Sequence, residues 1–173
     1  AFSELGAIRV EHVLSGILHG AAASAPLTLY RIADRRYPLF SGHAAGQVGF
    51  RWNPRGIEVV YTSVTYAGAM LEKLVHTGTG RMPARQMVIT ISVPAGVRVE
   101  ELDPALHPGW HRYAVSQRIG RRWVEQRRTA ILLVPSVVYE GHNALINPAH
   151  PDAASLTVSR PRQIRWDKRL FSI

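Results

Sequence analysis

The chain has 173 residues, of which 46% are hydrophobic, a formal net charge of +9 at pH 7 and no cysteine. This length suffices for one domain with its own core, and the lack of cysteine excludes disulfides, thiolate metal sites and a cysteine nucleophile. Apolar runs such as residues 131–135 are strand-sized, far short of the roughly 20 residues that span a bilayer. We therefore expect a soluble, cytoplasmic domain without a targeting segment, whose positive charge attracts anions.

The first part of the chain is expected to form an accessory helix. Residues 4–19 place leucine, isoleucine and valine at near-helical spacing, and this run ends at Gly20. The small-residue stretch over residues 21–26 has the composition of a linker. We therefore divide the chain into residues 1–24, a helix with its linker, and a domain over residues 25–173.

The stretch from Val48 to His76 is the unit around which the domain is expected to be organised. A strand over residues 27–32 and a loop over residues 33–47 precede it. The unit itself predicts a polar turn containing Arg51, Trp52 and Asn53, a strand over residues 57–62, and a helix with Thr65 as its N-cap.

The second half of the chain predicts mainly strands. The expected strands cover residues 86–93, 97–102, 130–138 and one or two segments within 156–171, with a weak helix over 110–120, a helix or edge strand over 123–128, and a polar turn over 143–152. Because strands outnumber helices, we expect an α+β domain built on a mixed, mainly antiparallel sheet with flanking helices.

Glu72 lies in the second turn of the predicted helix, one position away from its apolar stripe. A lone glutamate on a helix is most often solvated, but Tyr61 and Arg51 belong to the same supersecondary unit. A carboxylate can stabilise the oxocarbenium-like centre that forms when a glycosidic bond breaks. Glu72 is therefore our candidate for a catalytic carboxylate.

Two arginines and three aromatic residues are candidates for binding a nucleotide. Arg31 and Arg51 each offer a forked donor that suits a pyrophosphate, although a structural ion pair is equally consistent with the sequence. The rings of Tyr30, Tyr61 and Trp52 are suited to stacking on a base, although aromatic residues on strands more often belong to the core.

Ser136 follows Pro135 within the strongly apolar stretch over residues 130–138. Proline removes a ladder hydrogen bond and marks an edge or a bulge, which would turn the Ser136 hydroxyl toward a cleft. A role as nucleophile is weakly supported, because no Gly-x-Ser-x-Gly motif surrounds it.

Other patterns carry less information. His107 and His111 are four residues apart, but Pro108 and Gly109 break the helix that would align them, so we expect no metal site. Basic clusters at residues 118–128 and 160–169 fit a solvated face, and also fit an alternative function as an RNA-binding or RNA-cleaving module.

Taken together and in order, several motifs resemble the RES-domain toxins of bacterial RES-Xre toxin-antitoxin pairs, over residues 27–171. These motifs are LYRI with Arg31, FRWN with Arg51 to Asn53, VVYTS with Tyr61, AGAMLEKL with Glu72, and LLVPSVVYEGHNALINPAHPD with Ser136, Asn143, Asn147 and Pro148. The sequence departs from the family at Phe50, where members tend to have a second glycine before the arginine.

The resemblance implies a fold similar to the diphtheria-toxin type of ADP-ribosyltransferase and cleavage of the nicotinamide bond of NAD+. NAD+ would be a substrate and not a resident cofactor. Cleavage would end in hydrolysis, phosphorolysis or transfer of ADP-ribose to a protein such as a metabolic enzyme.

The family also implies roles for the candidate residues. Glu72 would stabilise the ribosyl cation, Arg31 and Arg51 would hold the phosphates, and Ser136 would order the ribose or nicotinamide. Tyr61 would pack on the nicotinamide side, while Tyr30, Trp52, Asn53, Asn143 and Asn147 would complete the substrate-binding set.

The resemblance further implies a partner, an Xre-family antitoxin that plugs the pocket in the bacterial cytoplasm and provides the only link to DNA. Residues 1–24 are extra relative to the family and resemble the C-terminal tail of such an antitoxin. If they mimic that tail, we expect their deletion to increase activity.

Overall fold

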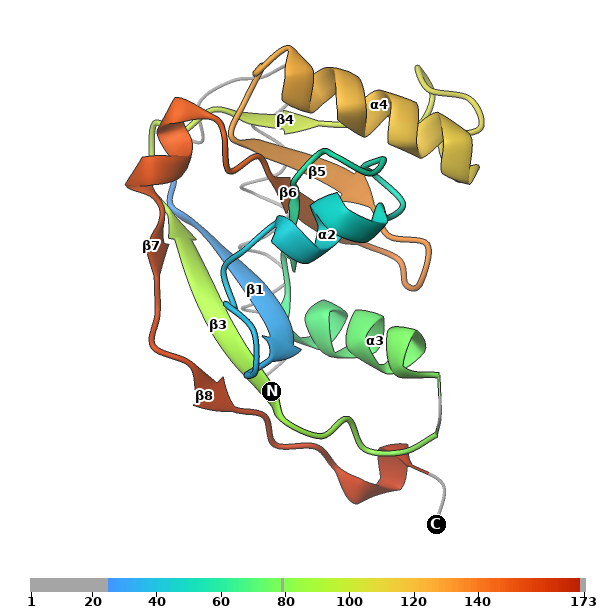
Figure 1. Cartoon of the computed structure of the whole chain (residues 1–173), viewed down its shortest axis with the longest axis vertical. Helices are drawn as coiled ribbons and strands as arrows, with labels where there is room; N and C mark the ends of the chain where they lie inside the picture. Colours follow the sequence, from blue (N-terminus) through green and yellow to red (C-terminus); the bar gives the residue numbers. More distant parts are fainter. Residues whose placement is uncertain (1–24, 79, 172–173) are drawn as a thin grey trace.

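The structure is a computed structural model that describes residues 25–78 and 80–171. The helix predicted over residues 4–19 and its linker up to residue 24 lie outside the described residues. Within the described part, the chain forms a curled sheet with helices on its faces (Figure 1).

The sheet has eight strands in the described part of the chain, arranged in the order β4-β5-β6-β2-β1-β3-β7, and β8 also pairs with β3. Neighbours are antiparallel except for the parallel pair β4 and β5. The strands are β1 (Leu27–Asp34), β2 (Val60–Ser63), β3 (Gln86–Val93), β4 (Val99–Glu101), β5 (Ile131–Pro135), β6 (His142–Ile146), β7 (Thr157–Val158) and β8 (Arg162–Gln163). The expected α+β class with a mixed, mainly antiparallel sheet is confirmed.

Three helices lie against this sheet in the described part of the chain. They are α2 (His43–Val48), α3 (Tyr66–Thr77) and α4 (Tyr113–Glu125), with short 3-10 turns η1 (Pro151–Ser155) and η2 (Lys168–Leu170). Helix α4 runs beside β4 and β5, whereas α3 lies beside β1 (Figure 1). Thr65 caps α3 as predicted, because its side chain accepts a hydrogen bond from the Gly68 amide.

The sheet is nearly divided between β1 and β2. Strand β1 pairs with β3 along its whole length, from Leu27 with Val93 to Asp34 with Gln86. With β2, by contrast, it shares the single pair Tyr30 and Ser63. The sheet therefore consists of two halves joined at one point.

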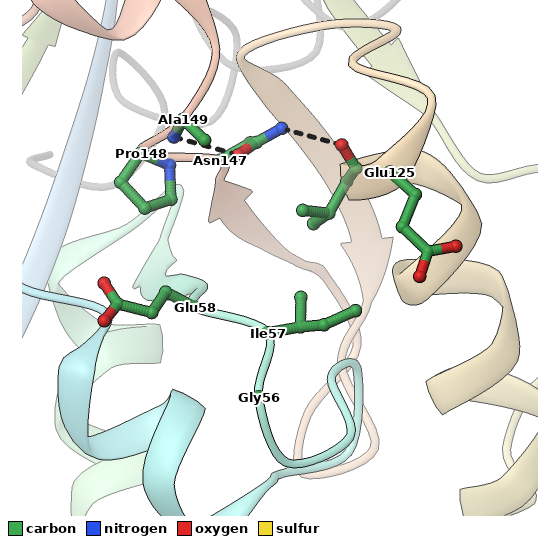
Figure 2. A pocket seen from close by; sticks show the side chains of 8 residues that line it. Gly56, Ile57, Glu58, Glu125, Asn147, Pro148 and Ala149 are labelled. Carbon is green, nitrogen blue, oxygen red and sulfur yellow. Dashed lines mark hydrogen bonds between the residues drawn. The ribbon is translucent and has the colours of Figure 1, made fainter.

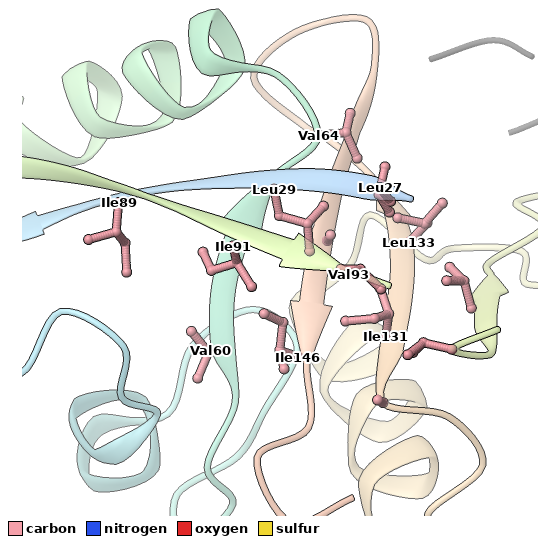
Figure 3. Close-up of a cluster of buried hydrophobic side chains, with 14 residues drawn as sticks. Leu27, Leu29, Val60, Val64, Ile89, Ile91, Val93, Ile131, Leu133 and Ile146 are labelled. Atoms are coloured by element: carbon pink, nitrogen blue, oxygen red, sulfur yellow. The ribbon is translucent and has the colours of Figure 1, made fainter. Parts of the chain in front are cut away.

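Alternating side chains build a core on each face of the sheet. The larger cluster includes Leu29, Ile91 and Ile146 and is shown in Figure 3. The second cluster, on the α4 side, is built around the fully buried Trp123 and includes Leu132 and Leu145. Sidedness of this kind follows from the two-residue repeat, and it places residues of odd number in β2 and β6 on the face opposite the larger core.

Several expectations needed correction. The predicted turn over residues 143–152 begins with the central strand β6, and the predicted loop over residues 33–47 contains α2. One continuous helix, α4 (Tyr113–Glu125), takes in most of the segment 110–120 and the beginning of 123–128, so the helix and not the edge strand holds for the first part of the second segment. The strand expected over residues 86–93 is confirmed as β3.

Candidate functional site

Glu72 is the centre of a polar cluster on the inner side of α3. Ser136 Oγ donates a hydrogen bond to its Oε1 over 2.7 Å, and Asn143 Nδ2 donates to the same oxygen over 2.6 Å. The second oxygen, Oε2, lies 3.7 Å from His76 Nε2, beyond hydrogen-bonding distance. One carboxylate oxygen is therefore held by two donors, while the other, within ion-pair distance of His76, accepts no hydrogen bond from the described part of the chain.

The three residues come from separate segments, and each is placed by its own element. Glu72 lies in the second turn of α3, Ser136 directly follows the last residue of β5, and Asn143 is the second residue of β6. The predicted interruption at Pro135 is confirmed, because β5 ends there. Pro135 pairs with His142 of β6, whereas the pairing of β5 with β4 extends only as far as Leu133, so the proline has a strand partner on one side only.

The Ser136 hydroxyl is fixed as a donor to Glu72. The amides of Val138 and Tyr139 donate to Ser136 Oγ over 3.0 and 3.3 Å, so the lone pairs of this oxygen are engaged and its proton points to the carboxylate. This geometry makes Ser136 a partner of the carboxylate.

Tyr139 belongs to the same cluster, although the sequence did not single it out. Its hydroxyl lies 2.7 Å from Ser63 Oγ, 2.8 Å from the His142 carbonyl oxygen and 3.2 Å from Asn143 Oδ1. Burial raises the pKa of Tyr139, and the nearby charge of Glu72 acts in the same direction, while the hydrogen bond with Ser63 opposes them. The one available sequence indication was an aromatic residue three positions after Ser136.

Arg31 lies at the point where β1 and β2 separate. Its guanidinium donates to the carbonyl oxygens of Leu39 over 2.6 Å, Tyr61 over 2.8 Å and Ser41 over 3.3 Å. Desolvation by burial lowers the pKa of Arg31 to about 10. Its bond to the Tyr61 carbonyl thus links β1 to β2 where the strands have separated, and the guanidinium places a positive charge beside the split in the sheet.

Lys73, the residue after Glu72, brings a second positive charge to this region. Burial lowers the pKa of Lys73; the charge of Arg31 lowers it further, and that of Asp34 opposes the shift. Lys73 and Arg31 thus bring two cationic side chains to the same region, together with the carboxylate of Asp34. The sequence analysis placed Lys73 only in the helical pattern.

Tyr61, Trp52 and Asn53 form a buried support beneath the turn over residues 50–57. The Tyr61 hydroxyl donates to Asn53 Oδ1 over 2.7 Å and accepts from the Trp52 amide over 2.9 Å. Asn53 is 0% exposed, and its amide nitrogen contacts three carbonyl oxygens within the turn and α2. Trp52 is 3% exposed and stacks on Trp110. In this arrangement the side chains of Trp52 and Asn53 are engaged inside the protein, which gives no support to the expectation that they contact a substrate.

Tyr30 and Arg51 lie on different sides of the domain. The Tyr30 ring is 6.0 Å from that of Tyr66 at the start of α3, and its backbone pairs with Ser63, so it borders the Glu72 cluster. Arg51 instead donates to the His111 carbonyl oxygen over 2.7 Å and lies over the Tyr113 ring. The contacts of Arg51 thus join it to the beginning of α4 and not to Arg31 or Glu72.

Asn147 is also separated from the Glu72 cluster. It is 0% exposed, donates to the Val124 carbonyl oxygen and accepts from the Ala149 amide, as Figure 2 shows. It lines an open cavity of about 460 Å³ together with Glu58 and Glu125. This cavity lies between α4 and the loops after α2 and β6, so it does not contain the Glu72 cluster.

Two further features of the described residues bear on the site. No group of three or more histidine, aspartate or glutamate side chains in this part of the chain is arranged to hold a metal ion. None of its helices is long and apolar enough to cross a membrane.

The fold is similar to that of a chain in a solved complex. A chain in the crystal structure of the M. tuberculosis MbcT-MbcA toxin-antitoxin complex superposes with a TM-score of 0.66 and 17% identity, covering 95% of this chain and 94% of that one. At this identity the likeness establishes the fold.

The sequence identifies the family. The RES domain model matches residues 28–167, and the chain belongs to the RES domain family. A relative from Sphingobium sp. (strain YBL2), named Prs ADP-ribosylating toxin, is 39% identical over 138 residues, which cover 76% of this chain and 86% of the relative. A Toxin Res from Pseudomonas putida KT2440 is 34% identical over 149 residues, covering 84% of this chain and all of that protein.

Proposed function

We propose that this protein is the toxin of a toxin-antitoxin system and that it cleaves the nicotinamide-ribose bond of NAD+. The ADP-ribose then passes to a protein target, to water or to phosphate. Family membership and the relative named as an ADP-ribosylating toxin support this proposal. The observation that carries it is the carboxylate of Glu72, with Oε1 held by two donors and Oε2 left available.

The chemistry requires stabilisation of a cation. When the bond between ribose C1′ and the nicotinamide nitrogen breaks, its electron pair leaves with nicotinamide and the ribose becomes an oxocarbenium-like cation. A fixed carboxylate stabilises that charge without reorganising during the reaction. Ser136 and Asn143 provide the fixation, and Glu72 Oε2 faces the cation in this proposal.

Arg31 and Lys73 are the proposed partners of the pyrophosphate. Burial is the main cause of the lowered pKa of Lys73, and the charge of Arg31 adds to it, so an anion between the two cations would stabilise the charged form of Lys73. Arg31 is preorganised by three carbonyl contacts and retains further N–H donors. Arg51 would join them only if the turn over residues 50–57 moved toward the cluster.

An antitoxin and an ADP-ribose acceptor are the proposed macromolecular partners. The structural neighbour comes from a toxin-antitoxin complex, which supports an antitoxin partner. The net charge of +9 favours an acidic surface on that partner. We propose an antitoxin of the Xre family, with a metabolic enzyme as the acceptor if transfer is the outcome.

The direct test incubates the purified chain with NAD+, with and without phosphate, and follows nicotinamide release by chromatography. Glu72→Gln is the decisive variant, because an amide can keep an oxygen toward Ser136 and Asn143 while losing the charge. We expect release to fall at least about a hundredfold. Glu58→Gln, the same change at an exposed glutamate that contacts His43, is the matched control and should behave as the wild type.

The products separate the possible acceptors. ADP-ribose indicates hydrolysis, a phosphorylated ADP-ribose indicates phosphorolysis, and a labelled protein band in a lysate with labelled NAD+ indicates transfer. A folded Glu72→Gln protein with wild-type activity would contradict the assignment. Salt-sensitive RNA binding or cleavage, with no effect on NAD+, would support the alternative RNA function instead.

A further inference from the structure

We propose that Tyr139 is a positioning residue. It orients Ser136 and Asn143, the two side chains that donate hydrogen bonds to Glu72, and its own side chain occupies a space that exists because residues 68 and 141 are glycines. The inference rests on the proposed function, because it explains how the catalytic carboxylate is held in place. In the described part of the chain no hydrogen bond joins Tyr139 to Glu72 directly, so its effect on Glu72 is indirect.

The hydrogen-bond directions in the cluster follow from the chemistry of its members. The His142 carbonyl oxygen and Asn143 Oδ1 can only accept, so the Tyr139 proton is given to one of them. Ser63 must then donate its own proton to the Tyr139 oxygen, over 2.7 Å. The result is a directed chain from Ser63 through Tyr139 to the backbone and side chain of β6.

Tyr139 contacts each donor of Glu72 in a different way. Its hydroxyl lies 3.2 Å from Asn143 Oδ1, which keeps the amide turned so that Nδ2 faces the carboxylate. Its backbone amide donates to Ser136 Oγ, which leaves the serine proton for the same carboxylate oxygen. One residue therefore orients both groups that hold Oε1.

The seat for this side chain is made by Gly68 and Gly141. A Cβ atom at Gly68 would overlap the Tyr139 hydroxyl, and one at Gly141 would come within 2.6 Å of the ring carbon Cε2. Gly141 also has a φ of 156°, a backbone conformation that residues with a side chain rarely adopt. Helix α3 thus carries a glycine in its first turn, at the position where the Tyr139 hydroxyl comes closest.

The principal test is Tyr139→Phe in the full chain, because phenylalanine fills the slot and removes only the hydroxyl. We expect kcat for nicotinamide release to fall about fivefold to tenfold, as for the loss of one hydrogen bond, with KM nearly unchanged. Tyr37→Phe, at an exposed tyrosine away from the cluster, is the matched control.

A double-mutant cycle with Asn143→Ala distinguishes positioning from general support of the fold. If the Tyr139 hydroxyl acts through Asn143, Tyr139→Phe costs little further activity when Asn143 is already alanine. An equal fold-loss in both backgrounds would overturn the proposal.

A second measurement keeps the inference testable without activity. The side-chain amide signals of Asn143 in nuclear magnetic resonance spectra, assigned by their loss in Asn143→Ala, should shift and exchange faster in Tyr139→Phe. Unchanged Asn143 signals would refute the positioning role. Wild-type protein that releases no nicotinamide would instead refute the proposed function, while these spectra still decide the role of Tyr139.

Discussion

Two separate groups of hydrogen-bonded polar side chains differ in how completely their atoms are engaged. Glu72, Ser136, Asn143 and Tyr139 form one group beneath α3, and Asn53 with Tyr61 forms the other within the turn before β2. In each group a hydroxyl from tyrosine contacts an asparagine side-chain oxygen. The first group leaves one carboxylate oxygen available, whereas the second has its polar atoms engaged, which is the difference expected between a reactive site and a structural support.

Tyr61 gives a test of the second group through pH. Burial raises the pKa of Tyr61 above its ordinary value, mainly by desolvating the phenolate. The unfolded chain therefore ionises this phenol near pH 10, while the folded protein holds the proton. Its contribution to the free energy of unfolding is complete below that pH and declines as pH rises above it. We expect denaturant unfolding to show this alkaline decline in the wild type.

Tyr61→Phe should remove that part of the alkaline decline and should lower stability at pH 7.5 by about 1–3 kcal/mol, because Asn53 Oδ1 and the Trp52 amide lose a buried partner. Tyr37→Phe, at an exposed side chain, serves as the control and should change neither quantity. If Tyr61→Phe has the stability of the wild type both at pH 7.5 and above about pH 10, the turn does not depend on this hydroxyl.

At the scale of elements, α4 depends on one close approach. Gly120 lies in the middle of the helix, and a Cβ atom there would overlap the carbonyl oxygen of Trp52. Three residues later along the chain, Trp123 fills the second core with no exposure. The helix can therefore reach the sheet only because position 120 has no side chain.

Gly120→Ala should consequently destabilise the protein by about 3 kcal/mol, as overpacking does, although alanine is the better helix former. The measurement is the midpoint of thermal or denaturant unfolding. Arg118→Ala, an alanine substitution at an exposed position of the same helix, should remain within about 0.5 kcal/mol of the wild type. A stabilised Gly120→Ala protein would mean that α4 and the Trp52 turn separate easily.

These elements also show what could be predicted from sequence. Strand β3 and the N-cap Thr65 follow from local patterns, and both were predicted. Strand β6 was not, because its five residues include His142 and Asn143 and become a strand only between β2 and β5. Helix α4 was divided because Gly120 weakens its local propensity, while the reason for that glycine lies in a tertiary contact.

The candidate site was predicted with similar limits. Glu72, Ser136 and Asn143 were singled out from motifs, and the structure brings these three together. Tyr139 and Lys73 could not be found in this way, because their importance depends on Ser63 and Arg31, which are distant in sequence. The family motifs also included Asn53 and Asn147. Both side chains are buried, and their hydrogen bonds give them a structural role in this arrangement.

At the scale of the molecule, basic residues outnumber acidic ones, with 21 lysines and arginines against 12 aspartates and glutamates. Several carboxylates are already paired with an arginine, as in Asp34 with Arg36, Glu100 with Arg128 and Asp167 with Arg169. The excess of +9 therefore belongs to basic groups beyond these pairs. An anionic substrate and an acidic partner would both be attracted. Their association rates should increase in buffers of low ionic strength, where charges are less screened.

Residues 1–24 provide the prediction that involves the whole chain. Their amphipathic pattern resembles the tail of an antitoxin, and a tethered segment acts at an effective concentration on the order of millimolar. If this segment occupies the site around Glu72, removing it frees the site for NAD+. We expect the chain that begins at residue 25 to release nicotinamide several times faster than the full chain, measured as initial rates at subsaturating NAD+.

Two controls distinguish occupancy of the site from a change in folding. A synthetic peptide of residues 1–24 added to the shortened chain should restore inhibition in a concentration-dependent way. The triple substitution Leu14→Ser, Ile17→Ser and Leu18→Ser in the full chain should raise turnover as the deletion does. The segment would then lose the apolar stripe through which it would bind. Equal turnover of the full and shortened chains, with no response to the peptide, would eliminate the idea that this segment mimics an antitoxin tail.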